Sequence, residues 1–393
     1  MSQFSNVIQR KGTRSVKWDY AEQLYQDKDI LPMWVADMDF QVPEAVISDL
    51  KERVDHGIFG YTMPDENVKH TIIEWLSKRH QWKIKEDWIT YSPGVIPSLH
   101  MTIQALTNKG DHILIQPPVY PPFYSVINDH ERKVVKNPLI YNKGRYTIDF
   151  EDFEKQIIEN EVKMFILCNP HNPVGRVWNE EELLKMGEIC LNHNVIIVSD
   201  EIHADLVLDE HKHLPVASLT EKLNEQTVTC FSPTKTFNLA GLQASYLVTS
   251  SKDKREKIKS HFDKQGMHML NTLGLTAMES AYLHGEDWLE GLLETIEANR
   301  DFVMEQFEEN TNQIKVLPLE GTYLLWMDCR SLNMSQAELK SFMQKQAKVG
   351  LNDGVSFGEE GEGFMRMNLA APPNIIAEGV NRILNAIREK PKA

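Results

Sequence analysis

MFILCNPHNPVGRVWNEEELLKMGEICLNHNVIIVSDEIHADL, residues 164–206, contains two short apolar runs separated by one helix-length segment. Asn179 is a favourable N-cap and Glu182 stands three residues later, as a capping box requires, so a helix is predicted from Asn179 to His193. The flanking runs MFILC and VIIVS are apolar throughout, which is typical of strands covered on both faces. The stretch therefore predicts a strand–helix–strand unit of a mostly parallel sheet.

Further runs of the same kind lie on either side, at DWITYS, HILIQ, TVTCF and SYLV, the last beginning at Ser245. They extend the prediction to a large α/β domain whose sheet is sandwiched by helices. Beyond about residue 286 a long amphipathic helix (Trp288 to Phe307) leads to strands at GTYLLWMD and GFMRMNLA, with a helix between them. We expect an N-terminal arm (1–45) that contributes to the small domain and the active site, a large domain (46–285) and a smaller α+β domain (286–393).

Two helices are predicted near the start of the chain. The first follows Pro43, places Val46, Leu50 and Val54 on one face, and stops near Gly57. The second runs from Asp65 to His80, with apolar residues at positions 68, 72 and 76.

Composition excludes several classes of protein. The 393 residues (45.3 kDa) contain 57 acidic and 42 basic side chains, for a net charge of −15. This balance, without a long Lys/Arg run, argues against nucleic-acid binding. The N-terminus has no apolar signal segment and no run approaches the ~18 residues that a spanning helix needs. We expect a soluble, cytoplasmic protein that does not bind membranes.

Cysteine and histidine spacing excludes a metal site. Cys168, Cys190, Cys230 and Cys329 form no C-x-x-C pair, which indicates a reducing compartment and free thiols, most of them buried. His211 and His213 are predicted to lie in a solvated turn, because no carboxylate or cysteine completes a ligand spacing.

Four loops that follow predicted strands could hold a ligand, since open α/β sheets bind ligands there. Gly94 stands between a strand and a helix, where backbone N–H groups attract an anion, although turn glycines are common. In NPHNPVG, residues 169–175, two Asn-Pro steps restrict the turn, so Asn172 either donates to a ligand or caps its own turn.

The other two loops carry charges at strand ends. Burying the Asp200 carboxylate would cost free energy unless it pairs with a cation or a protonated nitrogen. His203, three residues later, could reach the same pocket. The alternative is that Asp200 caps a helix. Lys235 lies in the tight turn SPTKTFNLAGL, where desolvation would make its amine a nucleophile; the alternative is a surface lysine.

Taken together, the four loops match the needs of one cofactor, pyridoxal 5′-phosphate (PLP). Its aldehyde needs a lysine, its phosphate a helix N-terminus, and its ring nitrogen a carboxylate that keeps the ring protonated.

The sequence resembles the class I/II aminotransferases, which are PLP enzymes of fold type I, and within them the MalY/PatB-type cystathionine β-lyases, or cysteine-S-conjugate β-lyases. The segments that carry the likeness are PMWVADMDF, NPHNPVG, DEIH, SPTKTFNLAGL and FMRMNLA, in this order. The resemblance implies a PLP-dependent lyase that cleaves cystathionine or a related cysteine S-conjugate to a thiol, pyruvate and ammonia.

The resemblance also assigns roles to single residues. Lys235 would bond covalently to the cofactor's aldehyde, and Asp200 would pair with its ring nitrogen. Asn172 would bond the cofactor's phenolic oxygen and also contact the substrate. Tyr120 would stack on the ring. The phosphate would be held by Gly94, Val95, Ser232 and, less clearly, Thr234.

Three further residues are expected around the substrate. Arg366 would bind the α-carboxylate, and Ala36 would lie in an arm segment that closes over the substrate. Tyr61 would reach the phosphate of a neighbouring subunit, which implies a homodimer with active sites at its interface.

Two positions depart from the transaminase pattern. His203 stands where transaminases usually have a tyrosine, and Gln243 where many have a phosphate-binding arginine. Both departures favour elimination, while leaving open the role of His203 and the cation that binds the phosphate.

Alternatives remain at this point. A PLP-dependent aminotransferase would use the same residues, and a protein with this fold could also regulate by binding a partner. A dinucleotide-dependent oxidoreductase is disfavoured, because no G-x-G-x-x-G follows an early strand. The thiol side of the substrate is not determined, although Trp34, Met38, Met267 and Met269 could line an apolar pocket or belong to the core.

Overall fold

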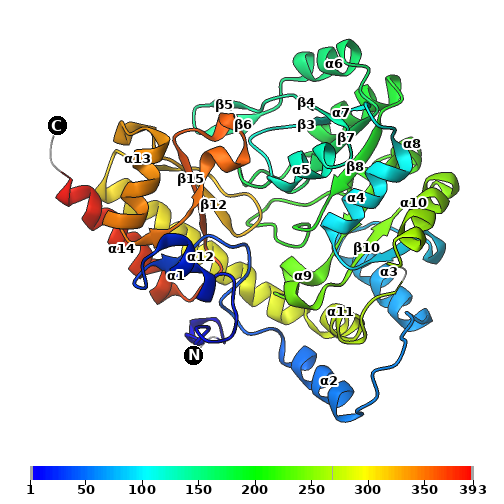
Figure 1. The fold of residues 1–393 in the computed structure, drawn as a ribbon, viewed down its shortest axis with the longest axis horizontal. Helices are drawn as coiled ribbons and strands as arrows, with labels where there is room; N and C mark the ends of the chain where they lie inside the picture. The colour runs from blue at the N-terminus through cyan, green and yellow to red at the C-terminus, as the bar shows by residue number, and fades with distance from the viewer. Residues whose placement is uncertain (1–2, 268, 391–393) are drawn as a thin grey trace.

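The computed structural model describes residues 3–267 and 269–390, so the outermost residues of the predicted arm and small domain lie outside the described residues. At its centre is a seven-stranded sheet of order β2-β10-β9-β8-β7-β3-β4 (Figure 1). Only β10 is antiparallel to its neighbours. Its strands are β2 (Ile89–Ser92), β3 (His112–Ile115), β4 (Lys133–Lys136), β7 (Met164–Cys168), β8 (Ile196–Asp200), β9 (Thr227–Phe231) and β10 (Ser245–Val248).

All six apolar runs predicted as strands belong to this sheet. The prediction missed β4, an edge strand whose alternating lysines and valines are half exposed. Helices cover both faces: α4 (Val95–Leu106), α5 (Pro122–Asn128), α6 (Phe150–Glu159), α7 (Glu180–Asn192), α8 (Glu221–Gln226), α10 (Lys252–Lys264) and α11 (Thr272–His284).

The strand β7 shows why the apolar runs are continuous. Phe165 and Leu167 pack in one hydrophobic cluster with α6 and α7, whereas Met164 and Ile166 pack in another with α4, α5 and α10. Both faces of the sheet are buried at β7, and all five of its residues are apolar and buried. The predicted capping box of α7 is present, with Asn179 and Glu182 exchanging hydrogen bonds.

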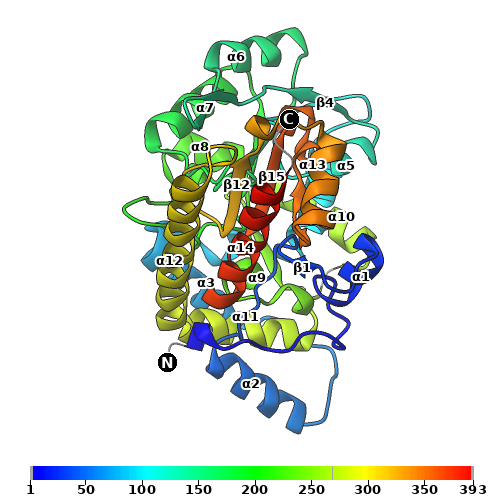
Figure 2. The ribbon, with the colours of Figure 1, turned by 90° about the vertical axis from the view of Figure 1, so that its left-hand side faces the viewer.

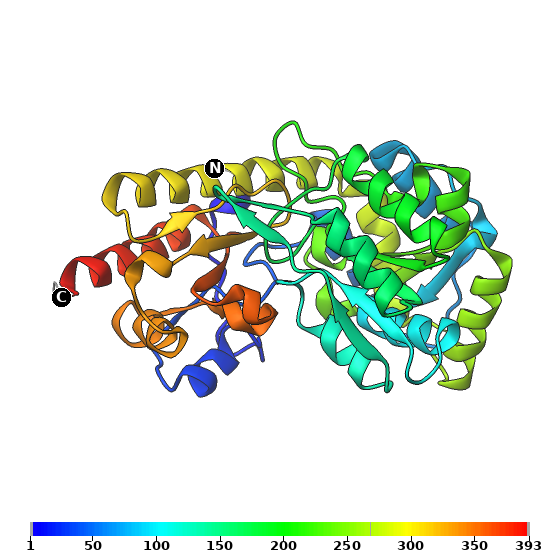
Figure 3. The ribbon, with the colours of Figure 1, turned by 90° about the horizontal axis from the view of Figure 1, so that it is seen from above.

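A second, four-stranded antiparallel sheet has the order β11-β12-β15-β14. Its elements and neighbours are α12 (Glu286–Asn310), β11 (Lys315–Val316), β12 (Leu324–Asp328), α13 (Gln336–Ser341), β14 (Asn352–Asp353), β15 (Phe364–Asn368) and α14 (Pro373–Glu389). The long helices α12 and α14 lie side by side along this sheet (Figure 2). The second sheet and its helices form the smaller lobe of the molecule, and the seven-stranded sheet with its helices forms the larger one. Figure 3 shows α12, in yellow, along the top of the smaller lobe and reaching the edge of the larger one. A separate hairpin is formed by β5 (Ile140–Asn142) and β6 (Arg145–Thr147).

The N-terminal arm joins the smaller lobe. Its strand β1 (Leu31–Pro32) pairs in parallel with β13 (Val349–Gly350), and α1 (Asp19–Tyr25) lies beside that lobe (Figure 1). A buried ion cluster fixes the segment that follows: Asp39 binds Lys17 at 2.8 Å and Arg10 at 2.7 Å.

The two predicted N-terminal helices are present as α2 (Glu44–Asp55) and α3 (Glu66–His80), and Asp65 caps the second through its side chain. Val46 is buried, but Val54 is 49 % exposed, because the end of α2 lies at the margin of the fold (Figures 1 and 2). In the described part of the chain, no helix is both long and apolar enough to cross a membrane.

Candidate active site

A cavity of about 420 Å³ opens where the carboxyl ends of the central strands meet the arm and the second sheet. Nine of the residues proposed from the sequence line it: Ala36, Gly94, Val95, Tyr120, Asn172, Asp200, His203, Lys235 and Arg366. They come from distant parts of the chain, so the fold gathers most of the predicted site in one place.

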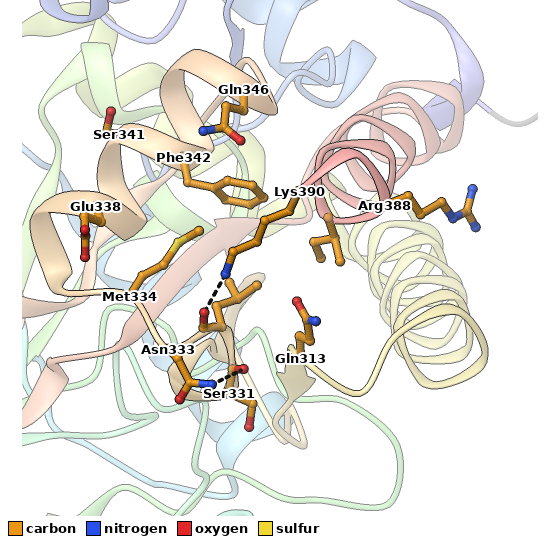
Figure 4. Close-up of a pocket in the computed structure, with 12 residues that line it drawn as sticks. Gln313, Ser331, Asn333, Met334, Glu338, Ser341, Phe342, Gln346, Arg388 and Lys390 are labelled. Atoms are coloured by element: carbon orange, nitrogen blue, oxygen red, sulfur yellow. Dashed lines mark hydrogen bonds between the residues drawn. The ribbon is translucent and has the colours of Figure 1, made fainter. Parts of the chain in front are cut away.

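A larger pocket, about 820 Å³, lies in the smaller lobe beside the end of α14 (Figure 4). Lys390 crosses it and donates to the carbonyl of Leu332 at 2.7 Å. None of the residues proposed from the sequence lines this pocket. The smaller cavity is therefore the candidate active site.

Lys235 is held in the cavity by the short helix α9 (Pro233–Thr236). Ser232 caps this helix through its side chain, and Pro233 occupies its first position, where a proline is pre-organised for a helix. The Nζ of Lys235 donates to the carbonyl oxygen of Ala36 at 2.6 Å. Burial lowers the pKa of Lys235 to about 8, with the charge of Asp37 acting in the opposite direction. The amine is thus available as a base or nucleophile near neutral pH.

This lowered pKa predicts selective chemistry at Lys235. In cofactor-free protein at pH 8, about half of Lys235 would be a free amine, against roughly 0.4% of a surface lysine with an ordinary pKa near 10.4. Competitive acylation, followed by peptide mass spectrometry, should therefore label Lys235 with a midpoint near pH 8. Asp37→Asn should move the midpoint lower, because the Asp37 charge favours the ammonium form. A midpoint near that of surface lysines would contradict the prediction.

Asp200 is a buried carboxylate that forms no ion pair with any residue that the structure describes. It is 4% exposed and accepts one hydrogen bond, from the backbone nitrogen of Ile202 at 3.2 Å. Burial raises the pKa of Asp200 to about 7. A protonated ring nitrogen placed against it would restore its charge and satisfy its free oxygen.

Arg366 is a buried cation whose acceptors are all neutral among the described residues. Its Nη1 donates to Asn172 Oδ1 at 2.8 Å, and its Nη2 to Asn352 Oδ1 at 2.5 Å and to the carbonyl of Trp34 at 3.0 Å. Its Nε is buried and has no hydrogen-bond partner within the described ranges. Burial lowers the pKa of Arg366 to about 10. A guanidinium held in place without an acid is suited to bind a carboxylate as a fork.

Three other predicted residues surround these charges. Burial raises the pKa of the Tyr120 hydroxyl, so it stays protonated at neutral pH. Burial holds the pKa of His203 well below its usual value, and its Nδ1 has no hydrogen-bond partner among residues 3–267 and 269–390. With the Oδ1 of Asn172 accepting from Arg366, its Nδ2 has no partner in the described part of the chain.

The proposed phosphate site is only partly assembled. Gly94 and Val95 line the cavity at the N-terminus of α4, where free N–H groups and the helix dipole favour an anion. The hydroxyls of Ser232 and Thr234 instead bond each other at 2.6 Å, outside the lining. Tyr61 is 96% exposed and does not line this cavity.

Several site features were not predicted. Asn352 on β14 lines the cavity and holds Arg366, but no local signal marks this short edge strand. Of the four residues predicted either to line an apolar pocket or to belong to the core, Trp34 lines the cavity and Met38 belongs to the core, whereas the half-buried Met267 and Met269 lie outside the lining.

The prediction for His213 was wrong. Its side chain is buried and lies 2.8 Å from Glu201 Oε2, while its neighbour His211 is exposed. The chain folds back so that this loop covers the carboxyl side of β8, which its polar sequence did not indicate. Within the described ranges, no group of His, Cys, Asp or Glu is arranged to hold a metal.

The fold and these side chains define a PLP enzyme of fold type I. The residues present fit this cofactor. The cavity contains the buried amine of Lys235, the carboxylate of Asp200, which no described cation contacts, and the N-terminus of α4. The chain belongs to the aminotransferase class I and II family, which it matches over residues 28–383.

Similar proteins agree with this assignment. Cystathionine beta-lyase PatB of Bacillus subtilis (strain 168) is 46% identical over 384 residues, covering 98% of this chain and 99% of that protein. A PLP-bound protein of Clostridium difficile 630, assigned provisionally to the aminotransferases, has a TM-score of 0.96 at 46% identity (98% and 100% covered). Cystalysin of Treponema denticola, which contains PLP, has a TM-score of 0.96 at 38% identity (99% of each chain covered).

Proposed function

We propose that this protein is a PLP-dependent carbon–sulfur β-lyase that acts on cystathionine or related cysteine S-conjugates. With water, such a substrate yields a free thiol, pyruvate and ammonia. The observation that carries the proposal is that one cavity contains both Lys235, whose amine has a lowered pKa, and Arg366, whose buried guanidinium contacts only neutral acceptors among the described residues. The similarity to cystathionine beta-lyase PatB over nearly the whole chain supports elimination as the reaction.

Bound PLP supplies an aldehyde that takes the substrate's amino group and a ring that accepts the charge left when the α-proton departs. The chain's own residues do the rest. Arg366 binds the substrate's α-carboxylate and fixes the orientation of the α-carbon. Lys235 Nζ removes the α-proton, and its lowered pKa lets it do so near neutral pH. Asp200 would keep a positive charge at the cofactor's ring nitrogen. Once the α-proton has been removed, the C–S bond breaks and the thiol is released.

An aminotransferase would share every residue named so far, so the products must decide. Purified holoenzyme incubated with cystathionine or S-alkyl cysteines, without any keto acid, should release equal amounts of thiol and pyruvate. Amino transfer that depends on an added keto acid, with no thiol, would overturn the lyase proposal.

The active unit is proposed to be a homodimer in which Tyr61 serves the partner's phosphate. Tyr61 is exposed, and Ile58, Phe59 and Met63 around it are also exposed, as an apolar contact surface would be. We also propose a cytoplasmic location, in keeping with four free cysteines, and the division into an arm (1–45), a large domain (46–285) and a small domain (286–393).

Mixing two impaired variants should test the shared site. Tyr61→Ala and Lys235→Ala would each impair the homodimer at limiting cofactor, but a mixed dimer would retain one complete site. Random reassembly gives half mixed dimers, so activity should recover to about a quarter of the wild-type value. Activity no higher than the mean of the two separate variants would show that Tyr61 does not act across the interface.

A further inference from the structure

A second buried carboxylate, Asp205, lies directly behind the lysine turn and has no place in the mechanism above. It is 6% exposed, and it stands in the loop that follows β8. Its Oδ2 accepts from the hydroxyl of Thr236 at 2.8 Å, and Thr236 is the neighbour of Lys235 on α9. This hydrogen bond joins the loop that follows β8 to α9, the helix that carries Lys235.

The other oxygen of Asp205 ties the same loop to α3. Oδ1 accepts from the indole Nε1 of Trp75 at 3.1 Å and lies 2.8 Å from His80 Nε2. Burial alone would raise the pKa of Asp205, but the bonds from His80 and Thr236 outweigh it, so the pKa lies below its ordinary value. Asp205 is therefore a carboxylate at neutral pH.

The helix α3 also contacts the lysine turn on both sides. The ring of His80 stacks with Phe231, the last residue of β9, at 6.0 Å between centroids. Trp75 meets Phe237, just after Thr236, edge to face at 5.7 Å. The turn that bears Lys235 is thus held by rings at both ends and by Asp205 in its middle.

We propose that Asp205 is a positioning residue, which through Thr236 fixes α9 and so the direction in which Lys235 meets the reacting atoms. A buried carboxylate costs free energy that an apolar contact would not. Asp205, however, accepts directional hydrogen bonds from Trp75, His80 and Thr236. These bonds fix the orientation of α9 more closely than apolar packing would. This role rests on the proposed function of Lys235 as the base.

Thr236→Val removes the hydroxyl that donates to Asp205 and changes the shape of the side chain little. It is a milder change than Asp205→Ala, which would leave the donors around a buried carboxylate without an acceptor and could prevent folding. We expect Thr236→Val in the holoenzyme to lower kcat roughly ten- to hundredfold with KM within about twofold. The isotope effect with α-deuterated substrate should increase, because proton removal becomes slower. Thr236→Ser, which keeps the hydroxyl, should restore most of kcat.

Thr229→Val is the matched control. Thr229 is fully buried on β9, and its hydroxyl has no hydrogen-bond partner in the part of the chain that the structure describes, so the same substitution there breaks no hydrogen bond. Amide exchange of a peptide covering 232–242 gives a readout independent of activity. It should be at least about tenfold faster in Thr236→Val than in Thr229→Val.

The outcomes separate the two proposals. If the wild-type protein releases no thiol, the lyase proposal fails, while faster exchange in Thr236→Val would still support the anchoring of α9. If Thr236→Val matches Thr229→Val in kcat, isotope effect and exchange, the positioning role is refuted. A lower kcat with an unchanged isotope effect and unchanged exchange would refute it as well.

Discussion

Replacing Lys235 with alanine should reduce thiol release from cysteine S-conjugates by at least about 10⁴-fold, since it removes both the nucleophile and the general base. The amine lines the cavity beside the arm, and its Nζ lies 2.6 Å from the Ala36 carbonyl oxygen. Burial lowers its pKa to about 8, so part of it is a free amine near neutral pH, and a water molecule in its place would be a far weaker base. Initial rates of thiol and pyruvate formation measure the loss.

Two variants show whether the loss is specific. Lys235→Arg keeps a positive charge but cannot be deprotonated, so it should be as inactive as alanine. Lys252→Ala removes a lysine whose side chain is 79% exposed and should leave the rates unchanged. Substantial activity in Lys235→Arg would contradict a role for this residue as base or nucleophile.

Arg366→Ala should lower kcat/KM by roughly 30-fold to several thousandfold, the effect of about 2–5 kcal/mol from losing one partner of a buried, hydrogen-bonded charge pair. The guanidinium is oriented by Asn172, Asn352 and the Trp34 carbonyl, so the orientation exists before any carboxylate binds. Its plane also lies over the ring of Phe357, 4.9 Å from the centroid. Most of the loss should therefore come from a higher KM.

Matched variants test the geometry of this contact. Arg366→Lys keeps the charge without the fork and should recover only a small part of kcat/KM. Arg330→Ala removes a half-exposed arginine that pairs with Asp328 and does not line the cavity, so it should have little effect. An Arg366→Ala enzyme with unchanged KM and kcat would show that the substrate's carboxylate binds elsewhere.

Much of the fold was predictable because its signals are local. The runs at 164–168 and 196–200 could be recognised as strands because they are short, mostly apolar and almost entirely buried, and the capping box at Asn179 requires only Glu182. The strand β4 escaped prediction because an edge strand has one exposed side, and its lysines hide the pattern.

The site was predictable to a different degree. Lys235, Asp200 and Asn172 stand at strand ends, where topology requires ligands to bind, and the family motifs assign their roles. Asn352 and Asp205 have no such signal, since each acts through a contact with a distant element. His213 was assigned to solvent because a polar loop says nothing about what covers it.

The sequence by itself determined the strands, helices and caps, and through its motifs the identity of the amine and the acid. Tertiary structure alone decided that Arg366 would meet Asn172, 194 positions away, and that Lys235 would meet Ala36, 199 positions away. It also determined the pKa values of Lys235, Asp200 and Arg366, because the pKa of a group depends on how deeply the folded chain buries it and on the charges and dipoles around it. Local patterns depend on neighbours in sequence, whereas desolvation depends on neighbours in space.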